Sequence, residues 1–357
     1  MLTCITEVKV PATALFSAGI PDLVDLAPIK LELQITTSTD DAWMASVLTR
    51  TSQAVSDYCH RVFQPQTYQD QFWPQRDHWP DQLPCGIQPL QLSGWPLTAA
   101  ICPAGIAPPQ VPWLSYVSGG TLAQAIYWVR ITYVTNQGDE TACSLEARQG
   151  VPANNLLTVS TPSADTQGIA IGWNCYISSG ASGSFGETLQ NSVPIDFQTS
   201  FTMASTGLVA GASVPNYITV VENSAKSIAP VTAPLNISNQ SSSLAEGVDF
   251  IANQKNGQLS RLFPDGCERE WPALPIIVQY QAGFSTIPSD LQDAAIRLVA
   301  FRWHSRGRDP SVKQENIPGA YQAEYWYGTG PGAPFDMPAD IAAMLARNYR
   351  VPIIGGA

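Results

Sequence analysis

Apolar residues recur at helical spacing over about residues 40–60. Thr39 or Asp40 can cap the start of this helix, and the acidic Asp40 and Asp41 suit the positive end of its dipole. One face carries the apolar side chains, which are Trp43, Met44, Val47, Leu48, Ala54, Val55 and Tyr58. This single stripe predicts a helix that packs on a core along one side.

Two further helices are predicted toward the end of the chain. One begins at Ser289, where Gln292 completes a capping box, and its few charges predict a helix buried on most sides, in a core or between subunits. The other covers about 338–349, with Pro338 in its first turn. Residues 306–336 lie between these helices, are rich in Gly, Pro and Tyr, and predict a long loop.

Short segments with the alternation of β-strands lie between the first two helices. They cover residues 68–73, 87–97, 217–222, 248–259 and 276–280. Asn256 and Gly257 form a strong hairpin signal within the fourth segment. These strands predict a small β layer that belongs with the helices.

Residues 101–215 differ from the rest of the chain because charged residues become sparse and strand signals dominate. Strands are predicted at 127–134, 155–159, 171–177 and 200–203. Trp173, Cys175 and Ile177 share one face of the third strand. The pattern indicates a β-sandwich inserted into a surface loop of another domain, a kind of insertion that loops tolerate.

The predicted fold is therefore α+β, with a small core of about three helices and a β layer, interrupted by an all-β sandwich of the immunoglobulin or fibronectin type. Residues 28–100 and 216–305 form the discontinuous core, and 101–215 form the insert. An N-terminal arm at 1–27 precedes the core. The loop at 306–336 and then a helix with an apolar docking tail at 337–357 follow it.

The composition of the chain disfavours some classes of function. The chain has 357 residues, with 18 basic and 29 acidic side chains and a net charge of −11. This acidic balance disfavours a protein that grips nucleic acid through phosphates. No apolar stretch approaches the roughly 20 residues of a membrane span, and residues 1–20 lack the pattern of a signal peptide. We therefore expect no membrane partner.

Residues typical of catalysis or metal binding are few. The seven cysteines are far apart, without a C-x-x-C pair, and predict free thiols, and the three histidines come from distant segments. No motif of a phosphate-binding loop, a dinucleotide fold, a zinc protease or a serine hydrolase occurs. Asp40 and Asp41 are explained by helix capping, and Glu268 and Glu270 by a solvated turn. We expect no enzyme, no metal and no cofactor.

With the insert set aside, the order of elements resembles the head-to-tail adaptor (connector or head-completion) proteins of tailed bacteriophages. The residues that carry this resemblance lie in two blocks. They are 30–35, Asp40, Asp41, Ala54, Tyr58 and 61–63 in the first block, and 277–284, 287–294, Arg306, Leu345, Tyr349 and Arg350 in the second. The insert resembles the fibronectin type III-like modules of phage proteins, through its strands at 127–134 and 173–177.

The resemblance implies a structural virion protein that is assembled in the cytoplasm of the bacterial host. Members of the family form a ring, usually of twelve copies, at the head–tail interface. The ring docks under the portal protein, meets a tail or tail-completion protein, and extends the channel through which genomic DNA passes without specific binding. An acidic chain is compatible with such a channel.

Two sets of residues are candidates for the contacts of such a ring. The first set, expected to dock on the portal, is Tyr349, Arg350, Val351, Pro352, Ile353 and Ile354. The second set, expected to pack the ring core or the subunit interface, is Trp43, Val47, Leu298, Phe301 and Trp303.

An alternative interpretation is a structural protein of a phage tail or baseplate that binds carbohydrate or a cell surface. Trp113, Tyr116, Tyr127 and Trp128 would then form an aromatic binding face on the sandwich. Aromatic residues that alternate on strands more commonly pack in the core or against neighbouring strands, so the two interpretations differ in which of these rings are exposed.

Overall fold

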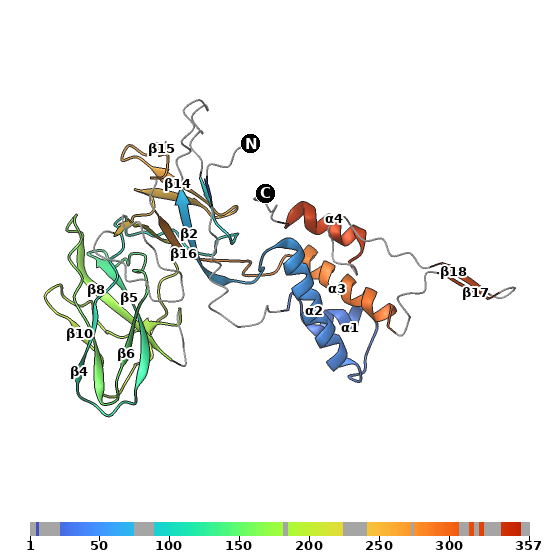
Figure 1. Cartoon of the computed structure of the whole chain (residues 1–357), viewed down its shortest axis with the longest axis horizontal. Coiled ribbons are helices and arrows are strands. Elements are labelled where there is room, and N and C mark those ends of the chain that lie inside the picture. Colours follow the sequence, from blue (N-terminus) through green and yellow to red (C-terminus); the bar gives the residue numbers. More distant parts are fainter. Residues whose placement is uncertain are drawn as a thin grey trace. The chain divides into compact units, whose positions relative to one another are not determined.

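A computed structural model describes residues 5–6, 22–74, 89–180, 185–223, 241–272, 275–306, 314–317, 321–324 and 337–350 (Figure 1). The chain divides into two compact units. Met1–Phe16 and Gln66–Ala282 form the first, here called the strand unit, and Ser17–Pro65 and Gly283–Ala357 form the second, here called the helical unit. This division differs from the predicted one, which places helices and β layer in one domain and the insert in another.

Four helices and one hairpin make up the described part of the helical unit (Figure 1). The helices are α1 (Leu26–Glu32), α2 (Asp41–Cys59), α3 (Ser289–His304) and α4 (Ala339–Asn348). They share one core, which includes Met44, Val47, Leu48 and Val55 of α2, Leu291, Leu298 and Val299 of α3, and Ile341 and Leu345 of α4. The predicted helix at 40–60 and its apolar stripe are confirmed.

Several predictions for the helical unit are wrong in detail. Helix α1 begins at Leu26, partly inside the segment predicted as an extended arm. The residue that caps α3 is Pro288, not Ser289, and the Gln292 amide donates to the Ile287 carbonyl at 2.8 Å, so no capping box forms. The fully buried residues of α3 lie along one face, and Ser289, Arg297 and His304 are its exposed positions, with the others partly buried.

The segment predicted as one long loop at 306–336 contains secondary structure. Strands β17 (Gln314–Ile317) and β18 (Tyr321–Glu324) pair antiparallel, with Gln314 opposite Glu324 and Ile317 opposite Tyr321. The prediction of a loop over the whole segment is therefore wrong for these two strands.

The strand unit contains a five-stranded antiparallel sheet in the order β1-β2-β16-β11-β12 (Figure 1). Its strands are β1 (Ile5–Thr6), β2 (Gln66–Pro74), β11 (Thr219–Asn223), β12 (Ser241–Leu244) and β16 (Ile276–Ala282). Strands β2 and β16 pair along seven residues, from Ile276 opposite Phe72 to Ala282 opposite Gln66. The strands predicted near 68–73, 217–222 and 276–280 are confirmed.

A second, smaller sheet shares a core with the five-stranded one. It consists of β3 (Leu90–Gln91), β13 (Phe250–Asn253), β14 (Gln258–Leu262) and β15 (Glu268–Arg269). The turn between β13 and β14 contains Gly257 with a φ of +66°, so the predicted hairpin is confirmed. The strand predicted over 87–97 is much shorter: among its described residues Leu90–Gln91 form a strand, and Leu97 forms an isolated bridge with Ala282.

Residues 114–202 form two antiparallel sheets that share one core, as expected of a β-sandwich. The first sheet, in the order β10-β7-β4, consists of β4 (Leu114–Ser118), β7 (Asn155–Val159) and β10 (Phe201–Thr202). The second sheet, in the order β6-β5-β8-β9, consists of β5 (Ala125–Thr135), β6 (Ala147–Val151), β8 (Ala170–Ser179) and β9 (Thr188–Leu189). Trp173, Cys175 and Ile177, which were predicted to share one face of their strand, are all fully buried in the core of the sandwich.

Candidate functional site

Tyr349 and Arg350, the first two residues of the predicted docking segment, are held against the helical unit. The Tyr349 hydroxyl donates to the Asp290 carboxylate at 2.6 and 2.7 Å from its two oxygens. The Tyr349 ring packs on Phe63 and Phe284, with centroid distances of 5.8 and 6.2 Å. These contacts make Tyr349 an anchor for the segment that follows it, whereas residues 351–354 lie outside the described residues.

The surroundings of Tyr349 keep its hydroxyl protonated. Burial raises the pKa of Tyr349, and the neighbouring Asp290 carboxylate raises it further. The Arg350 guanidinium lies over the Tyr58 ring at 4.8 Å, and the Tyr58 hydroxyl donates to the Ala342 carbonyl at 3.1 Å. The last helix is therefore fixed to α2 through Ala342 near its start and Arg350 after its end, and to α3 through Tyr349.

Replacing Tyr349 by phenylalanine is expected to destabilise the helical unit by about 1–2 kcal/mol, because the Asp290 carboxylate loses its phenolic donor. Urea unfolding monitored by circular dichroism measures this change. Tyr116→Phe is the matched control, because the Tyr116 side chain is 47% exposed, and it should change the unfolding free energy by less than about 0.5 kcal/mol. Equal effects of the two variants would contradict the role of Tyr349 as an anchor.

The predicted packing residues fall into two groups. Val47 and Leu298 are buried within the helical core, whereas Trp43, Phe301 and Trp303 are only partly buried. The rings of Trp43 and Trp303 meet edge to face, with a centroid distance of 5.5 Å. Of the five residues, therefore, only the three aromatic ones have surface left for contact with another subunit.

An arginine joins the two tryptophans to the start of α2. The Arg306 guanidinium lies 4.9 Å from the Trp43 ring and 5.3 Å from the Trp303 ring, and its Nη1 is 2.6 Å from Oδ1 of Asp40. This cluster ties the beginning of α2 to the end of α3. Exposed ion pairs contribute little by themselves, so the aromatic contacts carry most of this connection.

Most of the residues behind the family resemblance lie in the helical unit, whereas residues 277–282 belong to β16 of the strand unit. Lys30 pairs with Asp41 at 2.8 Å. Across the two blocks, the Phe284 amide donates to the Phe63 carbonyl at 2.7 Å, and the guanidinium of Arg61 lies over both of these rings. Together with the contact of Asp40 with Arg306, these bonds connect positions that are more than 200 residues apart.

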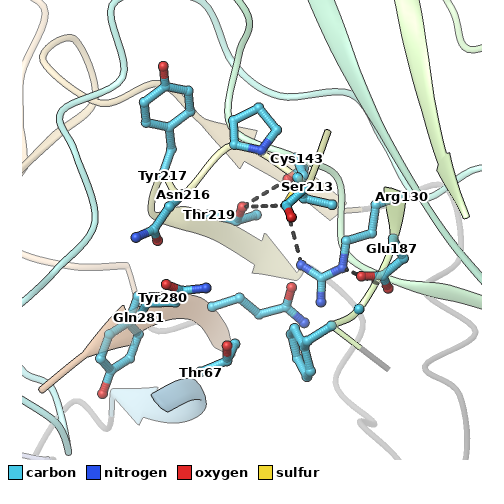
Figure 2. A pocket seen from close by; sticks show the side chains of 15 residues that line it. Thr67, Arg130, Cys143, Glu187, Ser213, Asn216, Tyr217, Thr219, Tyr280 and Gln281 are labelled. Atoms are coloured by element: carbon cyan, nitrogen blue, oxygen red, sulfur yellow. Dashed lines mark hydrogen bonds and ion pairs between the residues drawn. The ribbon is translucent and has the colours of Figure 1, made fainter. Parts of the chain in front are cut away.

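A cavity of about 200 Å³ lies in the strand unit (Figure 2). Strands β2, β11 and β16 of the five-stranded sheet form part of its wall, through Thr67, Thr219 and Gln279. The sandwich and the segment that leaves it supply the rest, including Arg130 of β5 and residues 185–187 and 213–217. The cavity is thus lined by parts of the chain that lie far apart in sequence.

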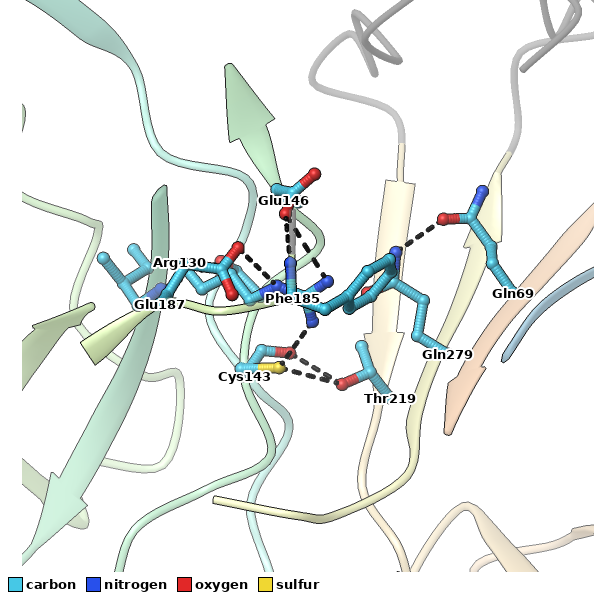
Figure 3. Close-up of polar contacts among 10 residues, drawn as sticks. Gln69, Arg130, Cys143, Glu146, Phe185, Glu187, Thr219 and Gln279 are labelled. Atoms are coloured by element: carbon cyan, nitrogen blue, oxygen red, sulfur yellow. Dashed lines mark hydrogen bonds and ion pairs between the residues drawn. The ribbon is translucent and has the colours of Figure 1, made fainter. Parts of the chain in front are cut away.

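Arg130 is the central charged group of this cavity (Figure 3). Its Nε is 3.4 Å from Oε1 of Glu187, its Nη2 is 3.9 Å from Oε1 of Glu146, and its Nη1 is 3.3 Å from Sγ of Cys143. The guanidinium also lies over the Phe185 ring at 4.2 Å. Burial by itself disfavours the charge of Arg130, but the acidic neighbours raise its pKa overall, so it remains protonated.

The carboxylate of Glu187 remains ionised in spite of its burial. Burial tends to raise the pKa of Glu187, but the Arg130 guanidinium and nearby backbone amides hold it below its usual value. The sequence contains one signal of this buried pair that was missed. Arg130 is one of only two basic residues in 101–215, and it interrupts an otherwise apolar and aromatic strand.

The four aromatics of the carbohydrate-binding alternative do not form one face. Tyr127 is buried in the sandwich core. Trp128 is partly buried on β5 with the Arg148 guanidinium 5.9 Å from its ring. Trp113 is 75% exposed and Tyr116 is 47% exposed, but they belong to the other sheet or its edge. The structure therefore brings together no aromatic platform from these residues.

The described residues contain no metal site and no membrane-spanning helix. Within the described ranges, no group of three or more His, Cys, Asp or Glu side chains could hold a metal ion. The five cysteines in those ranges are free, and Cys4 and Cys85 lie outside them. None of the described helices has the length and apolarity needed to cross a bilayer. Comparison with protein-family models, curated proteins and solved structures gives no match.

Proposed function

We propose that this chain is a structural protein of a tailed-phage virion, an adaptor that forms a ring between the portal and the tail. The observation that carries the proposal is the convergence of the two resemblance blocks. In the helical unit Asp40 of the first block pairs with Arg306 of the second, and Phe63 of the first block packs on Phe284 of the second. Two independent contacts between the blocks are what a shared adaptor core would require.

The anchored position of Tyr349 supports a docking role for the residues that follow it. An interaction that uses a short apolar segment is stronger when the segment begins at a fixed point, because less conformational entropy is lost on binding. Residues 351–354 are Val, Pro, Ile and Ile, an apolar sequence suited to an apolar groove or a sheet edge of the portal.

The sandwich has a core of its own, separate from the cores of the helices and of the five-stranded sheet. It therefore suits a module added to the adaptor, facing away from the DNA channel, where a domain of this size has room. The expected partners are further copies of the chain, the portal, and a tail or tail-completion protein, at the head–tail interface of the virion. DNA passes through the ring without specific binding, and the proposal assigns neither catalysis nor a cofactor.

Electron microscopy of the full chain mixed with the portal protein of the same phage tests this function. We expect portal particles to gain a ring-shaped layer, and we expect deletion of residues 351–357 to abolish that layer. Trp113→Ala is the control variant, because this exposed side chain lies in the sandwich and is not expected to face the portal.

A control for folding and a defined negative result make the outcome decisive. Circular dichroism of the deletion variant shows whether its helices still form, so that a lost layer reports docking and not unfolding. Protein that stays monomeric alone is compatible with assembly on the portal. Full-length chain that leaves portal particles undecorated at micromolar concentration contradicts the adaptor function.

A further inference from the structure

Strand β4 is an edge strand of the sandwich that lacks the features by which proteins usually protect such edges. Among the described strands it ends the sheet β10-β7-β4 (Figure 1). From Leu114 to Ser118 it has no charge, no proline and no shift in its register with β7, whereas β6, an edge of the other sheet, carries Arg148. The other two edges, β9 and β10, are only two residues long. Because exposed edges are normally protected by charge, proline, bulges or shortness, β4 is suited to pair with a further strand.

The hydrogen bonds of β4 show which of its backbone groups point to the open edge. The Ser160 amide donates to the Trp113 carbonyl at 2.9 Å, and the Gly119 amide donates to the Asn154 carbonyl at 3.0 Å. Since the bonds of an antiparallel ladder alternate along each strand, the odd-numbered residues from 113 to 119 are the ones that bond to β7 and its flanks. The N–H and C=O groups of the even-numbered residues therefore point to the open edge. These residues are Leu114, Tyr116 and Ser118.

A second copy of this chain is the partner that best fits an uncharged edge. The chain has a net charge of −11, so two copies repel each other overall. Residues 101–129, which include β4, contain no charged side chain, and neither do the neighbouring strands β7 and β10. Two copies therefore meet with the least repulsion where this sheet of one copy faces the same sheet of the other.

The sequence of β4 is also complementary to itself. When two β4 strands are antiparallel about a two-fold axis at Tyr116, Leu114 of each copy lies opposite Ser118 of the other, and the two Tyr116 residues lie opposite each other. All three residues that point to the open edge then face one another, and each pair exchanges two hydrogen bonds. In this register Trp113, which is 75% exposed, lies opposite Gly119 of the other copy, where the absence of a side chain leaves room for the indole ring.

We propose that the sandwich binds the sandwich of a second copy through β4, so that one sheet continues across both chains. The contact is isologous, because the same surface is used on each side. Pairing of two five-residue strands makes a small interface, so we expect a weak dimer with a Kd of about 10–100 µM. This inference goes beyond the adaptor function and does not depend on it.

Sedimentation velocity of the full chain over about 1–500 µM tests the pairing, with charges introduced at Ser115 and Val117. Both side chains are exposed, and in the proposed register Ser115 of each copy lies opposite Val117 of the other. The variant Ser115→Lys/Val117→Lys places like charges opposite each other and should weaken dimerisation roughly tenfold or more. The matched control, Ser115→Lys/Val117→Glu, places opposite charges there, keeps the net charge of −11 and should dimerise within roughly threefold of the unsubstituted chain.

A mixture of two variants tests the register further. Chains with Ser115→Lys/Val117→Lys and chains with Ser115→Glu/Val117→Glu should each stay monomeric at concentrations where their mixture dimerises, because lysine then faces glutamate across the axis. Circular dichroism of each variant shows whether it is folded, and the retained dimer of the Lys/Glu control shows that charge at these positions does not itself disrupt β4.

Three results overturn the proposal. The first is an unsubstituted chain without a concentration-dependent dimer up to about 500 µM. The second is a Lys/Lys variant that dimerises as well as the unsubstituted chain, and the third is a Lys/Glu control that is as weak as the Lys/Lys variant. Because both substituted positions lie in the sandwich, assembly through the helical unit would be equal in all variants, and none of these outcomes bears on the adaptor function.

Discussion

Replacing Gly283 by alanine is expected to destabilise the helical unit by about 3 kcal/mol or more. Gly283 has a φ of +134°, which side chains rarely allow, and its amide neighbour Phe284 is bonded to the Phe63 carbonyl at 2.7 Å. A Cβ at this position would lie 2.7 Å from the backbone nitrogen of Pro65 and still closer to the carbonyl group of Gln64. The clash is with backbone, so no side chain can move aside to relieve it.

The measurement is urea unfolding of Gly283→Ala beside two control variants. Gly138 has a φ of +87° and open space where the methyl group of an alanine would lie, so Gly138→Ala isolates the cost of the positive φ, about 1 kcal/mol. Gly150 lacks both features, and Gly150→Ala should be close to neutral. If Gly283→Ala costs no more than Gly138→Ala, the close approach to Gln64 and Pro65 does not exist in solution.

The same glycine shows what a linear sequence can reveal about this fold. The end of a strand at Ala282 and Gly283 was predictable from composition, because glycine interrupts strands. The reason that only glycine fits was not predictable, since the obstructing atoms belong to Gln64 and Pro65, more than 200 positions earlier. The local sequence pattern therefore indicates where the strand ends. The tertiary contact with Gln64 and Pro65 explains why the residue at that position must be glycine.

The helices also differ in how far local sequence predicts them and how far they depend on tertiary contact. Helix α2 has 19 residues with a clear apolar stripe, so periodicity alone predicts it. Helix α1 has seven residues, includes Pro28, and buries only Ile29, so its formation depends on packing against α2 and α3 more than on its own sequence. Similarly, β4 was missed because most of its residues are exposed at the edge of a sheet and lack the alternation of a half-buried strand.

The candidate sites depend even more on tertiary contact. Tyr349 was predicted to face the portal, but its hydroxyl is held by Asp290, which lies 59 positions earlier. The buried pair of Arg130 and Glu187 joins β5 to a segment that follows β8, and Gln279 reaches the same cavity from another sheet. The spacing of charged residues along the chain does not predict these contacts between distant segments. A single arginine within an apolar strand does indicate that a buried partner is needed at that position.

Replacing Trp173 by alanine is expected to cost about 3–5 kcal/mol, the largest effect among these substitutions. The Trp173 ring is fully buried at the centre of the sandwich core, and its indole nitrogen donates to the Asp196 carbonyl at 3.3 Å. Removing it leaves a large cavity between the two sheets and takes one of two donors from the Asp196 carbonyl, which still accepts from the Thr199 amide at 3.0 Å. Trp113→Ala removes the same side chain from a site that is 75% exposed, and it should cost less than about 0.5 kcal/mol.

The regions that lose structure in Trp173→Ala show whether the sandwich and the helical unit unfold independently. Because the sandwich and the helices have different cores, hydrogen exchange measured by mass spectrometry should lose protection in β5, β7 and β8 and retain it in α2 and α3. If the adaptor function belongs to the helical unit, decoration of portal particles should then survive the substitution. Loss of protection in α2 and α3 as well would mean that the two cores unfold as one, and the sandwich would then be an integral part of the adaptor and not an added module.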